Sequence, residues 1–240
     1  MIPKVIHYCW FGRGQMPELA RKCIESWKKY LPNYEIKEWN EDNFNLDMYP
    51  YVRQAYDSRK FAFVTDVVRL YALYVDGGVY MDTDVEVLKP LDSFLHHNAF
   101  SGFESNTTVP TGIMAAEKGS IWAKELLDRY KGRLFINGDG TFDLTTNVTE
   151  ITNYMLDKGL EEDNNYQDFP GLVTIYPSDY FCPKDHVTGK ITLTDRTVCI
   201  HHFAGSWLPA DVKIRHRIKL FLIDIFGSKF VDGIRKIFLK

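Results

Sequence analysis

The stretch FAFVTDVVRLYALYVDGGVYMDTDVEV, residues 61–87, holds a helix pattern, a glycine turn, a strand pattern and an acidic turn in direct succession. Apolar residues cover most of 61–75, which predicts a helix that is buried on more than one side. We expect the helix to end at Asp76-Gly77-Gly78, because glycine readily adopts the left-handed conformation that closes helices. Val79-Tyr80-Met81 then predicts a short buried strand, and Asp82-Thr83-Asp84 follows where that strand emerges.

The two aspartates of this acidic turn flank a single residue, so their carboxylates lie close together and repel each other unless a cation neutralises them. Mg²⁺ and Mn²⁺ are the natural partners, because they bind through one or two carboxylates together with substrate phosphates. A bare Asp-x-Asp is common in surface turns. Here the apolar approach through Gly77–Met81 would bury the turn, so the sequence predicts a divalent-metal site at Asp82 and Asp84.

Asp66 and Arg69 are three residues apart and therefore share one face of the predicted helix. One interpretation is a surface ion pair, worth less than about 1 kcal/mol. Their neighbours are nearly all apolar, which favours a buried, hydrogen-bonded pair instead. An aspartate can accept hydrogen bonds from sugar hydroxyls, and an arginine can bind a pyrophosphate with its two-pronged guanidinium group.

The remaining pattern predicts a single α/β domain with no internal repeat. Strands are expected at 5–11, 34–39, 85–88, 172–176 and 197–203, and helices at 17–30 and 120–131, with a polar irregular stretch at 137–168. Open α/β sheets bind ligands at the carboxyl ends of their strands. Both Trp10 and the acidic turn fall at such ends, although Trp10 could instead belong to the core.

Charge is distributed unevenly along the 240 residues, whose formal net charge is −3. Residues 212–240 hold eight Lys or Arg and two Asp, a net charge of +6, so residues 1–211 carry −9. The overall balance gives no indication of nucleic-acid binding. An acidic body followed by a basic tail predicts two functional regions, a folded α/β domain at 1–211 and an amphipathic helical tail at 212–240.

Cysteine spacing and hydropathy indicate the compartment. The four cysteines lie far apart, without a CxxC pair, so neither a zinc site nor a disulfide framework is expected. The first residues do not form a signal-peptide core, and no apolar run reaches transmembrane length. We therefore expect a reducing, cytoplasmic setting.

Three ordered motifs resemble glycosyltransferase family 32, the DXD-containing sugar transferases. They are IPKVIHYCWFG at 2–12, FAFVTDVVR at 61–69 continuing into GGVYMDTD at 77–84, and HHFAGSW at 201–207. That family includes bacterial capsular polysaccharide enzymes and yeast mannosyltransferases, and it is distantly similar to the glucosyltransferase domains of clostridial toxins. The resemblance implies a GT-A type, Rossmann-like nucleotide-sugar-binding domain with a central mixed sheet.

The resemblance also implies roles for individual residues. Trp10 would stack on the nucleobase, while Asp66 and Arg69 would hold the donor's ribose and sugar hydroxyls. Asp84 would be a direct Mn²⁺ or Mg²⁺ ligand, and Asp82 would bind the sugar, the metal or both. A closing motif would reach the diphosphate or the metal through Ser206, Trp207 and His202. Adjacent strand residues point to opposite faces, so at most one member of the His201-His202 pair is expected to be a ligand.

The implied reaction moves a sugar from a UDP- or GDP-linked donor to a hydroxyl of a glycan or lipid-linked glycan, with retention, in bacterial surface or capsular polysaccharide synthesis. Asp82, Asp84 and Arg69 are its expected catalytic residues. One alternative is a phosphatase of the haloacid-dehalogenase type, although Glu86 stands where that motif carries Thr or Val. Another is a nucleotide-sugar or glycan-binding module without turnover.

The tail, 212–240, alternates basic and apolar residues at its start, in VKIRHRIK at 212–219. Positive charge beside Phe, Leu and Ile suits helices that lie in an anionic membrane surface. This predicts membrane-surface association at the inner face of the cytoplasmic membrane. The alternative is a terminal helix that packs on the domain or on a second subunit.

Overall fold

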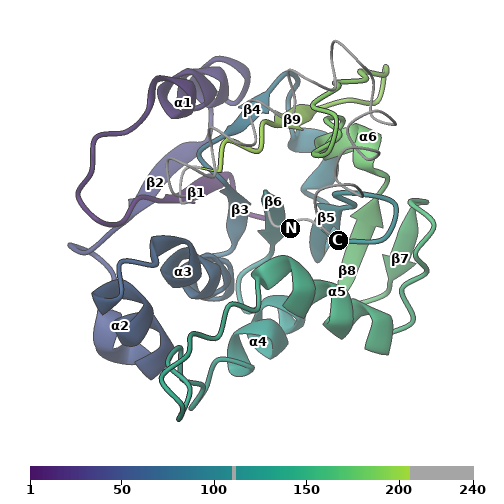
Figure 1. The fold of residues 1–240 in the computed structure, drawn as a ribbon. Coiled ribbons are helices and arrows are strands. Elements are labelled where there is room, and N and C mark those ends of the chain that lie inside the picture. Colours follow the sequence, from purple (N-terminus) through teal and green to yellow (C-terminus); the bar gives the residue numbers. More distant parts are fainter. Residues whose placement is uncertain (110–111, 206–240) are drawn as a thin grey trace, which may run out of the picture.

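A mixed seven-stranded sheet forms the centre of the computed structural model, which describes residues 1–109 and 112–205 (Figure 1). Its strand order is β2-β1-β3-β6-β5-β8-β7. The strands are β1 Val5–Cys9, β2 Glu35–Trp39, β3 Gly78–Met81, β5 Ala99–Gly102, β6 Ile113–Ala116, β7 Gln167–Phe169 and β8 Val173–Tyr176. Strands β6 and β7 run antiparallel to their neighbours, whereas β1 is parallel to both β2 and β3.

Helices cover both faces of this sheet. They are α1 Glu18–Tyr30, α2 Pro50–Asp57, α3 Phe61–Val75, α4 Ile121–Asp128, α5 Asn147–Asp157 and α6 Ser178–Phe181, with 3-10 turns at Leu46–Met48 and Asp92–Phe94. Helices α2 to α5 lie together on one side of the sheet in Figure 1, and α1 lies on the other. Side chains of β3 alternate between the two cores, since Tyr80 packs on the α3 side and Val79 and Met81 on the α1 side.

Two glycines connect α3 to β3. Gly77 and Gly78 have φ angles of 68° and 111°, which side chains rarely adopt. A Cβ on Gly78 would lie 2.6 Å from the carbonyl oxygen of Val5. Glycine therefore lets β3 approach β1 closely, so the ends of both strands meet at the same sheet edge.

A separate antiparallel pair lies beside that edge. Strand β4 (Val85–Val87) pairs with β9 (Cys199–His201), with Val85 opposite His201. Helix α1 supports the pair, because the fully buried Trp27 donates from Nε1 to the carbonyl oxygen of Val85 at 2.7 Å. This pairing brings a segment from the end of the described chain next to the Asp82-Thr83-Asp84 turn.

The prediction for 61–75 is confirmed to the residue, and the predicted strands and the helices at 17–30 and 120–131 are present with ends shifted by at most three residues. The expectation of an irregular stretch at 137–168 was wrong, because α5 and the start of β7 lie within it. Ser206, Trp207 and the tail 212–240 lie outside the described residues. Among the residues that are described, no helix is long and apolar enough to cross a membrane.

Candidate active site

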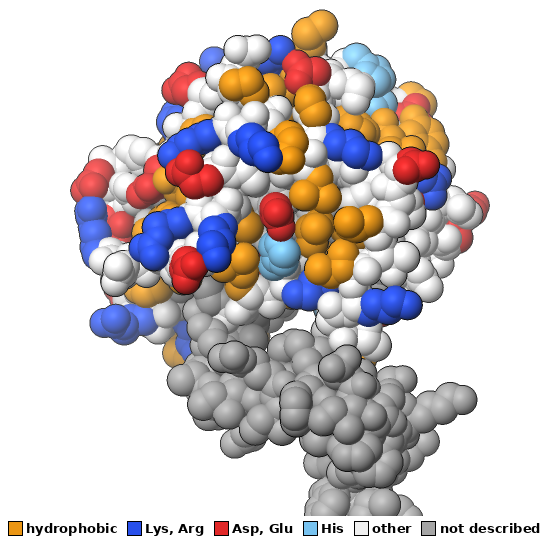
Figure 2. Space-filling model, turned by 90° about the horizontal axis from the view of Figure 1, so that it is seen from above, with side chains coloured by type: hydrophobic (Ala, Val, Ile, Leu, Met, Phe, Trp, Pro, Cys, Tyr) orange, Lys and Arg blue, Asp and Glu red, His pale blue; other side chains and the backbone are white. Residues whose placement is uncertain are grey.

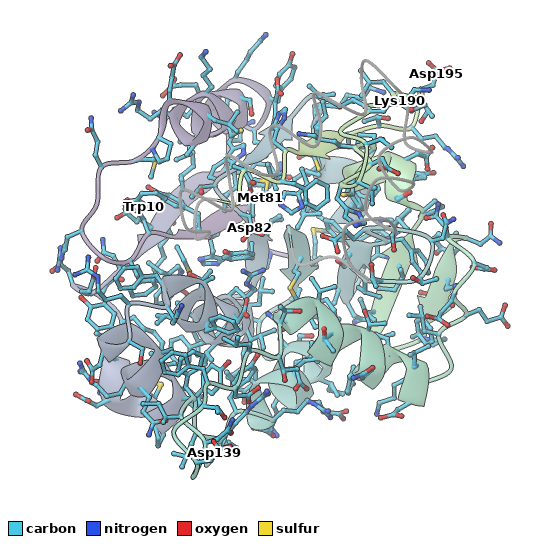
Figure 3. The ribbon with its side chains drawn as sticks, in the orientation of Figure 1. Trp10, Met81, Asp82, Asp139, Lys190 and Asp195 are labelled. Atoms are coloured by element: carbon cyan, nitrogen blue, oxygen red, sulfur yellow. The ribbon has the colours of Figure 1, made fainter. Side chains whose placement is uncertain are left out.

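The two aspartates of the acidic turn lie between β3 and β4, at the edge where β1 and β3 end, and Figure 3 shows the first of them, Asp82. The turn is fixed by its backbone, since Asp82 N–H donates to the Gly112 carbonyl at 2.8 Å and Val85 N–H donates to the Asp82 carbonyl at 3.0 Å. Their side chains are mostly buried, with 22% of Asp82 and 15% of Asp84 exposed. The placement at the end of a buried strand agrees with the prediction.

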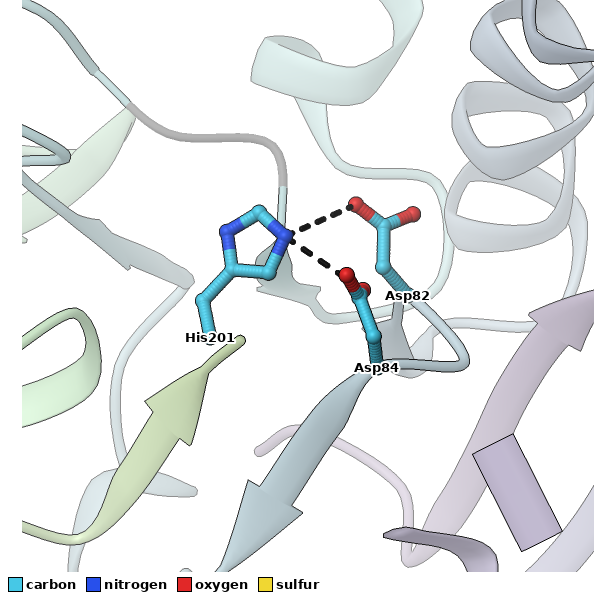
Figure 4. A group of neighbouring side chains, drawn as sticks. All are labelled: Asp82, Asp84 and His201. Atoms are coloured by element: carbon cyan, nitrogen blue, oxygen red, sulfur yellow. Dashed lines mark ion pairs between the residues drawn. The ribbon is translucent and has the colours of Figure 1, made fainter. Parts of the chain in front are cut away.

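His201 completes a three-residue cluster with these aspartates (Figure 4). Its Nε2 lies 3.4 Å from Asp84 Oδ1 and 4.0 Å from Asp82 Oδ2. Each aspartate uses its other oxygen within the protein. Asp84 Oδ2 accepts the N–H of Ala204 at 2.7 Å, and Asp82 Oδ1 accepts the hydroxyl of Tyr80 at 2.8 Å.

The three possible metal ligands of this cluster fit a divalent cation. One ligand atom from each of Asp82, Asp84 and His201 lies within 4.8 Å of the others. Neighbouring ligands of an octahedral ion with bonds of about 2.1 Å lie about 3 Å apart. The separations of 3.4 and 4.0 Å from His201 Nε2 are longer than that spacing, so the side chains would draw together slightly around an ion. Two carboxylates and one imidazole suit Mn²⁺ well, and a three-residue set leaves other coordination positions for a substrate.

The charges of the cluster are strongly coupled. Burial would raise the pKa of Asp84, but the charge of His201 and its hydrogen bond lower that pKa to about 2. Burial would lower the pKa of His201, and Asp84 outweighs this effect and raises it well above its ordinary value. Without an ion, protonated His201 thus supplies the positive charge between the carboxylates, so binding of a metal would release that proton.

Arg69 joins the cluster to helix α3. Its guanidinium Nη2 lies 3.3 Å from Asp66 Oδ1 and 3.2 Å from Asp82 Oδ1. The same group lies over the Tyr80 ring, with Cζ at 4.7 Å from the ring centroid. Only 6% of the Arg69 side chain and 11% of that of Asp66 are exposed. The prediction of a buried Asp66–Arg69 pair is confirmed.

Asp66 is held from a second direction by α5. The side-chain amide of Asn147, the first residue of that helix, donates from Nδ2 to the Asp66 backbone carbonyl at 3.2 Å. The backbone N–H of Asn147, at a helix start where the dipole favours negative charge, also acts to lower the pKa of the Asp66 carboxyl. Burial raises the pKa of Asp66 to about 6, against the lowering effect of Arg69. The segment that the sequence left irregular therefore contributes a structural partner to the site.

Trp10 follows the end of β1 and lies near Asp82 at the same sheet edge (Figure 3). Its indole Nε1 donates to the carbonyl of Gly14 at 2.7 Å, which ties the ring to the loop that leads into α1. Trp10 is half-buried and packs against the core on the α1 side. It therefore combines a packing contact with an accessible ring surface beside the site.

Trp10→Ala is expected to weaken the binding of a nucleotide donor by about 1–3 kcal/mol, the effect of losing one base–aromatic stack. Trp10→Phe keeps a ring and should lose much less. Calorimetric titration with UDP or GDP in the presence of Mn²⁺ measures both changes. If the two variants unfold and neither shows a selective loss of nucleotide affinity, Trp10 serves the core instead.

The structure places His201, and not the predicted His202, beside the aspartates. His202 Nε2 lies 2.8 Å from Glu86 Oε2, and its backbone N–H donates to the Asp84 carbonyl. The two side chains diverge because successive residues of an extended strand point to opposite faces. The third-ligand assignment therefore moves from His202 to His201.

His201→Ala is expected to weaken Mn²⁺ binding by more than about 100-fold, since it removes a direct ligand and loss even of an outer partner costs about 10–100-fold. His202→Ala is the matched control and should retain most of the affinity. Calorimetric titration of Mn²⁺ into the three proteins tests this. Equal losses in both variants would contradict the assignment of His201.

Two other features of the site had no strong signal in the sequence. Tyr80 lies inside a strand pattern, where an aromatic residue predicts packing, yet its hydroxyl orients Asp82. Glu104 follows β5, and burial raises the pKa of its carboxyl while charge interactions with His201 and His186 oppose that rise. A lone acidic residue in a polar loop gives no indication of such a location.

The fold of the chain and its Asp82-Thr83-Asp84 region match known sugar transferases. The family described as "Glycosyltransferase sugar-binding region containing DXD motif" matches residues 17–101. Inositol phosphoceramide mannosyltransferase 3 of Schizosaccharomyces pombe is 32% identical over 126 residues, which cover 49% of this chain and 34% of that protein. An uncharacterized glycosyltransferase of Acanthamoeba polyphaga mimivirus is 26% identical over 218 residues, covering 87% and 85%.

The crystal structure of a glycosyltransferase involved in the glycosylation of the major capsid of PBCV-1 superposes with a TM-score of 0.50 at 13% identity. The superposition covers 90% of this chain and 100% of that one. The fold is therefore the GT-A type that the sequence predicted. The chain spans about a third of the length of the fission-yeast mannosyltransferases it matches. The DXD region and these glycosyltransferase relatives support a place in the glycosyltransferase superfamily.

Proposed function

We propose that this chain is the catalytic domain of a metal-dependent glycosyltransferase that transfers a sugar from a nucleoside diphosphate donor to an acceptor hydroxyl. The observation that carries the proposal is the convergence of Asp82, Asp84 and His201 at the end of β3 in a GT-A fold. Each aspartate directs one oxygen toward His201 and anchors the other in the protein. Such anchoring leaves one carboxylate oxygen of each aspartate directed toward the place where an ion would bind.

Residues of the chain have separate tasks in this reaction. Asp82, Asp84 and His201 would hold the cation, which when bound offsets the negative charge that develops on the leaving diphosphate. Arg69 holds Asp82 in place, and with Asp66 it presents a buried, ordered polar surface toward the donor. Trp10, at the β1 side of the same edge in Figure 3, would stack its ring on the base.

The stereochemistry, the pathway and the donor sugar follow from the family resemblance. We propose a family 32 type enzyme that acts with retention in surface or capsular polysaccharide synthesis. Attack would come from the front face of the sugar, and the departing phosphate would take the acceptor's proton. Three matched fission-yeast proteins are named mannosyltransferases, so GDP-mannose is the first donor to examine.

Hydrolysis of a panel of UDP- and GDP-sugars by the purified chain, with Mn²⁺ and with EDTA, tests the proposed function. Metal-dependent release of UDP or GDP from one donor supports a transferase. Nucleotide binding without turnover of any donor would support a binding module instead. Release of inorganic phosphate from simple phosphomonoesters would support the phosphatase alternative.

We also propose that residues 212–240 bring the enzyme to the inner face of the cytoplasmic membrane, next to a lipid-linked acceptor. The basis is their net charge of +6 beside apolar residues. The full chain should sediment with anionic liposomes at low salt, and a chain that ends at Asp211 should not. If the full chain stays in the supernatant, the tail serves packing or an oligomer contact.

A further inference from the structure

The sheet edge that carries the metal cluster continues beyond it toward β5. Val79 of β3 and Phe100 of β5 both lie opposite Ala115 of β6, so the two strands are level. Both run in the same direction, antiparallel to β6, and Glu104 follows the end of β5 as Asp82 follows the end of β3. With about 4.8 Å between neighbouring strands, β5 lies about 10 Å from β3, on the side away from β1 and Trp10.

Glu104 is tied to the site by its charge and its backbone. Its N–H donates to the carbonyl of Thr108 at 2.8 Å, which closes a tight loop directly after the strand. Its partly buried carboxylate interacts through charge with His201, His186 and Asp82. Within residues 1–109 and 112–205, no hydrogen bond or ion pair occupies this carboxylate.

An aromatic surface adjoins the same side of the cluster. The Phe203 ring lies 4.2 Å from the His201 ring, and the exposed His186 ring lies 5.9 Å from Phe203. Phe203 has a φ of 53°, a conformation that a bulky residue rarely adopts and that the surrounding structure must hold. Its partly buried ring, two residues after the end of β9, therefore packs against the ring of His201.

We propose that Glu104 and Phe203 form the subsite for the acceptor sugar, with Glu104 accepting a sugar hydroxyl and Phe203 packing on the ring's apolar face. The inference rests on the proposed function, since it places the second substrate across the metal cluster from the donor side at Trp10. A carboxylate beside an aromatic ring matches a pyranose, which presents hydroxyls at its edge and C–H groups on its faces. The exposed His186 would lie at the outer edge of this subsite.

Saturation-transfer NMR with methyl glycosides of mannose, glucose and galactose tests the subsite on the full chain with Mn²⁺ and UDP or GDP. We expect at least one glycoside to bind the wild-type protein. Glu104→Gln should weaken that binding by about 10- to 100-fold, the effect expected for losing a hydrogen bond to a charged group. Phe203→Ala should also weaken it, because the substitution removes the apolar surface on which the sugar ring packs. The nucleotide affinity of Glu104→Gln, measured by calorimetry on the same samples, should change less than about twofold.

Glu162→Gln and Phe142→Ala are the matched controls. Both residues are exposed, and neither lies at the sheet edge that carries the metal cluster. Retained nucleotide binding shows that Glu104→Gln is folded and that the donor site is intact, so a failed subsite is distinguishable from a failed proposed function. Glycosides that bind the wild type and both subsite variants equally, or that bind none of them, would overturn the inference.

Discussion

Asp84→Asn is expected to lower metal-dependent turnover by more than about 100-fold while the protein remains folded. The change is nearly isosteric and removes the charge that draws a cation to the cluster, and loss even of an outer partner of a metal costs about 10–100-fold. Asparagine can still accept the Ala204 N–H that anchors this side chain. Donor hydrolysis with saturating Mn²⁺ measures the change, and circular dichroism checks the fold.

Glu86→Gln is the control for this substitution, since it removes a carboxylate two residues further along the chain, within β4. Glu86 contacts His202 and takes no part in the cluster. Its variant should keep turnover within a few fold of the wild type. Full activity of Asp84→Asn would refute the metal-site assignment, whereas equal losses in both variants would indicate a general effect of charge near the site.

The local part of the fold could be predicted from sequence because it rests on strong patterns. The helix at 61–75 has broad apolar coverage and a glycine stop, and β3 follows as an uninterrupted apolar run. Strands β5 and β6 escaped prediction since their sequences, AFSG and IMAA, are short and rich in residues with weak strand propensity. Pairing on both sides within the sheet makes them strands.

Long-range strand pairing decides which histidine joins the aspartates, and local sequence patterns do not show it. The choice between His201 and His202 depends on the register of β9 against β4, which places His201 opposite Val85. A one-residue slip would reverse the faces to which the two side chains point, and no local pattern fixes that register.

Helix α5 was missed for a different reason. Its first turn is polar, and Thr146 caps it through the N–H of Thr149 without the acidic residue of a capping box.

Arg69→Met is expected to lower the free energy of unfolding by about 3–5 kcal/mol, the cost of removing one partner from a buried ion pair. The substitution keeps an aliphatic side chain but leaves Asp66 and Asp82 buried without their shared cation. Urea denaturation without added metal measures the loss. Arg53→Met is the surface control, since its partners Asp47 and Asp57 are exposed, and it should cost less than about 1 kcal/mol.

The loss in Arg69→Met should depend on pH in a direction that follows from Asp66. Burial already raises the pKa of Asp66 to about 6, above its unfolded value of about 3.9, and removal of Arg69 would raise it further. The neutral form thus favours the folded state below pH 4, and this advantage is lost as the pH rises through the folded pKa. The free energy of unfolding of the variant should therefore be closest to that of the wild type near pH 4–5 and furthest from it near pH 8.

Asp66→Asn in the Arg69→Met background should recover part of the stability at pH 8, because it removes one of the two uncompensated charges. A loss that is independent of pH and unaffected by Asp66→Asn would mean that Arg69 contributes through packing on Tyr80 and not through its charge.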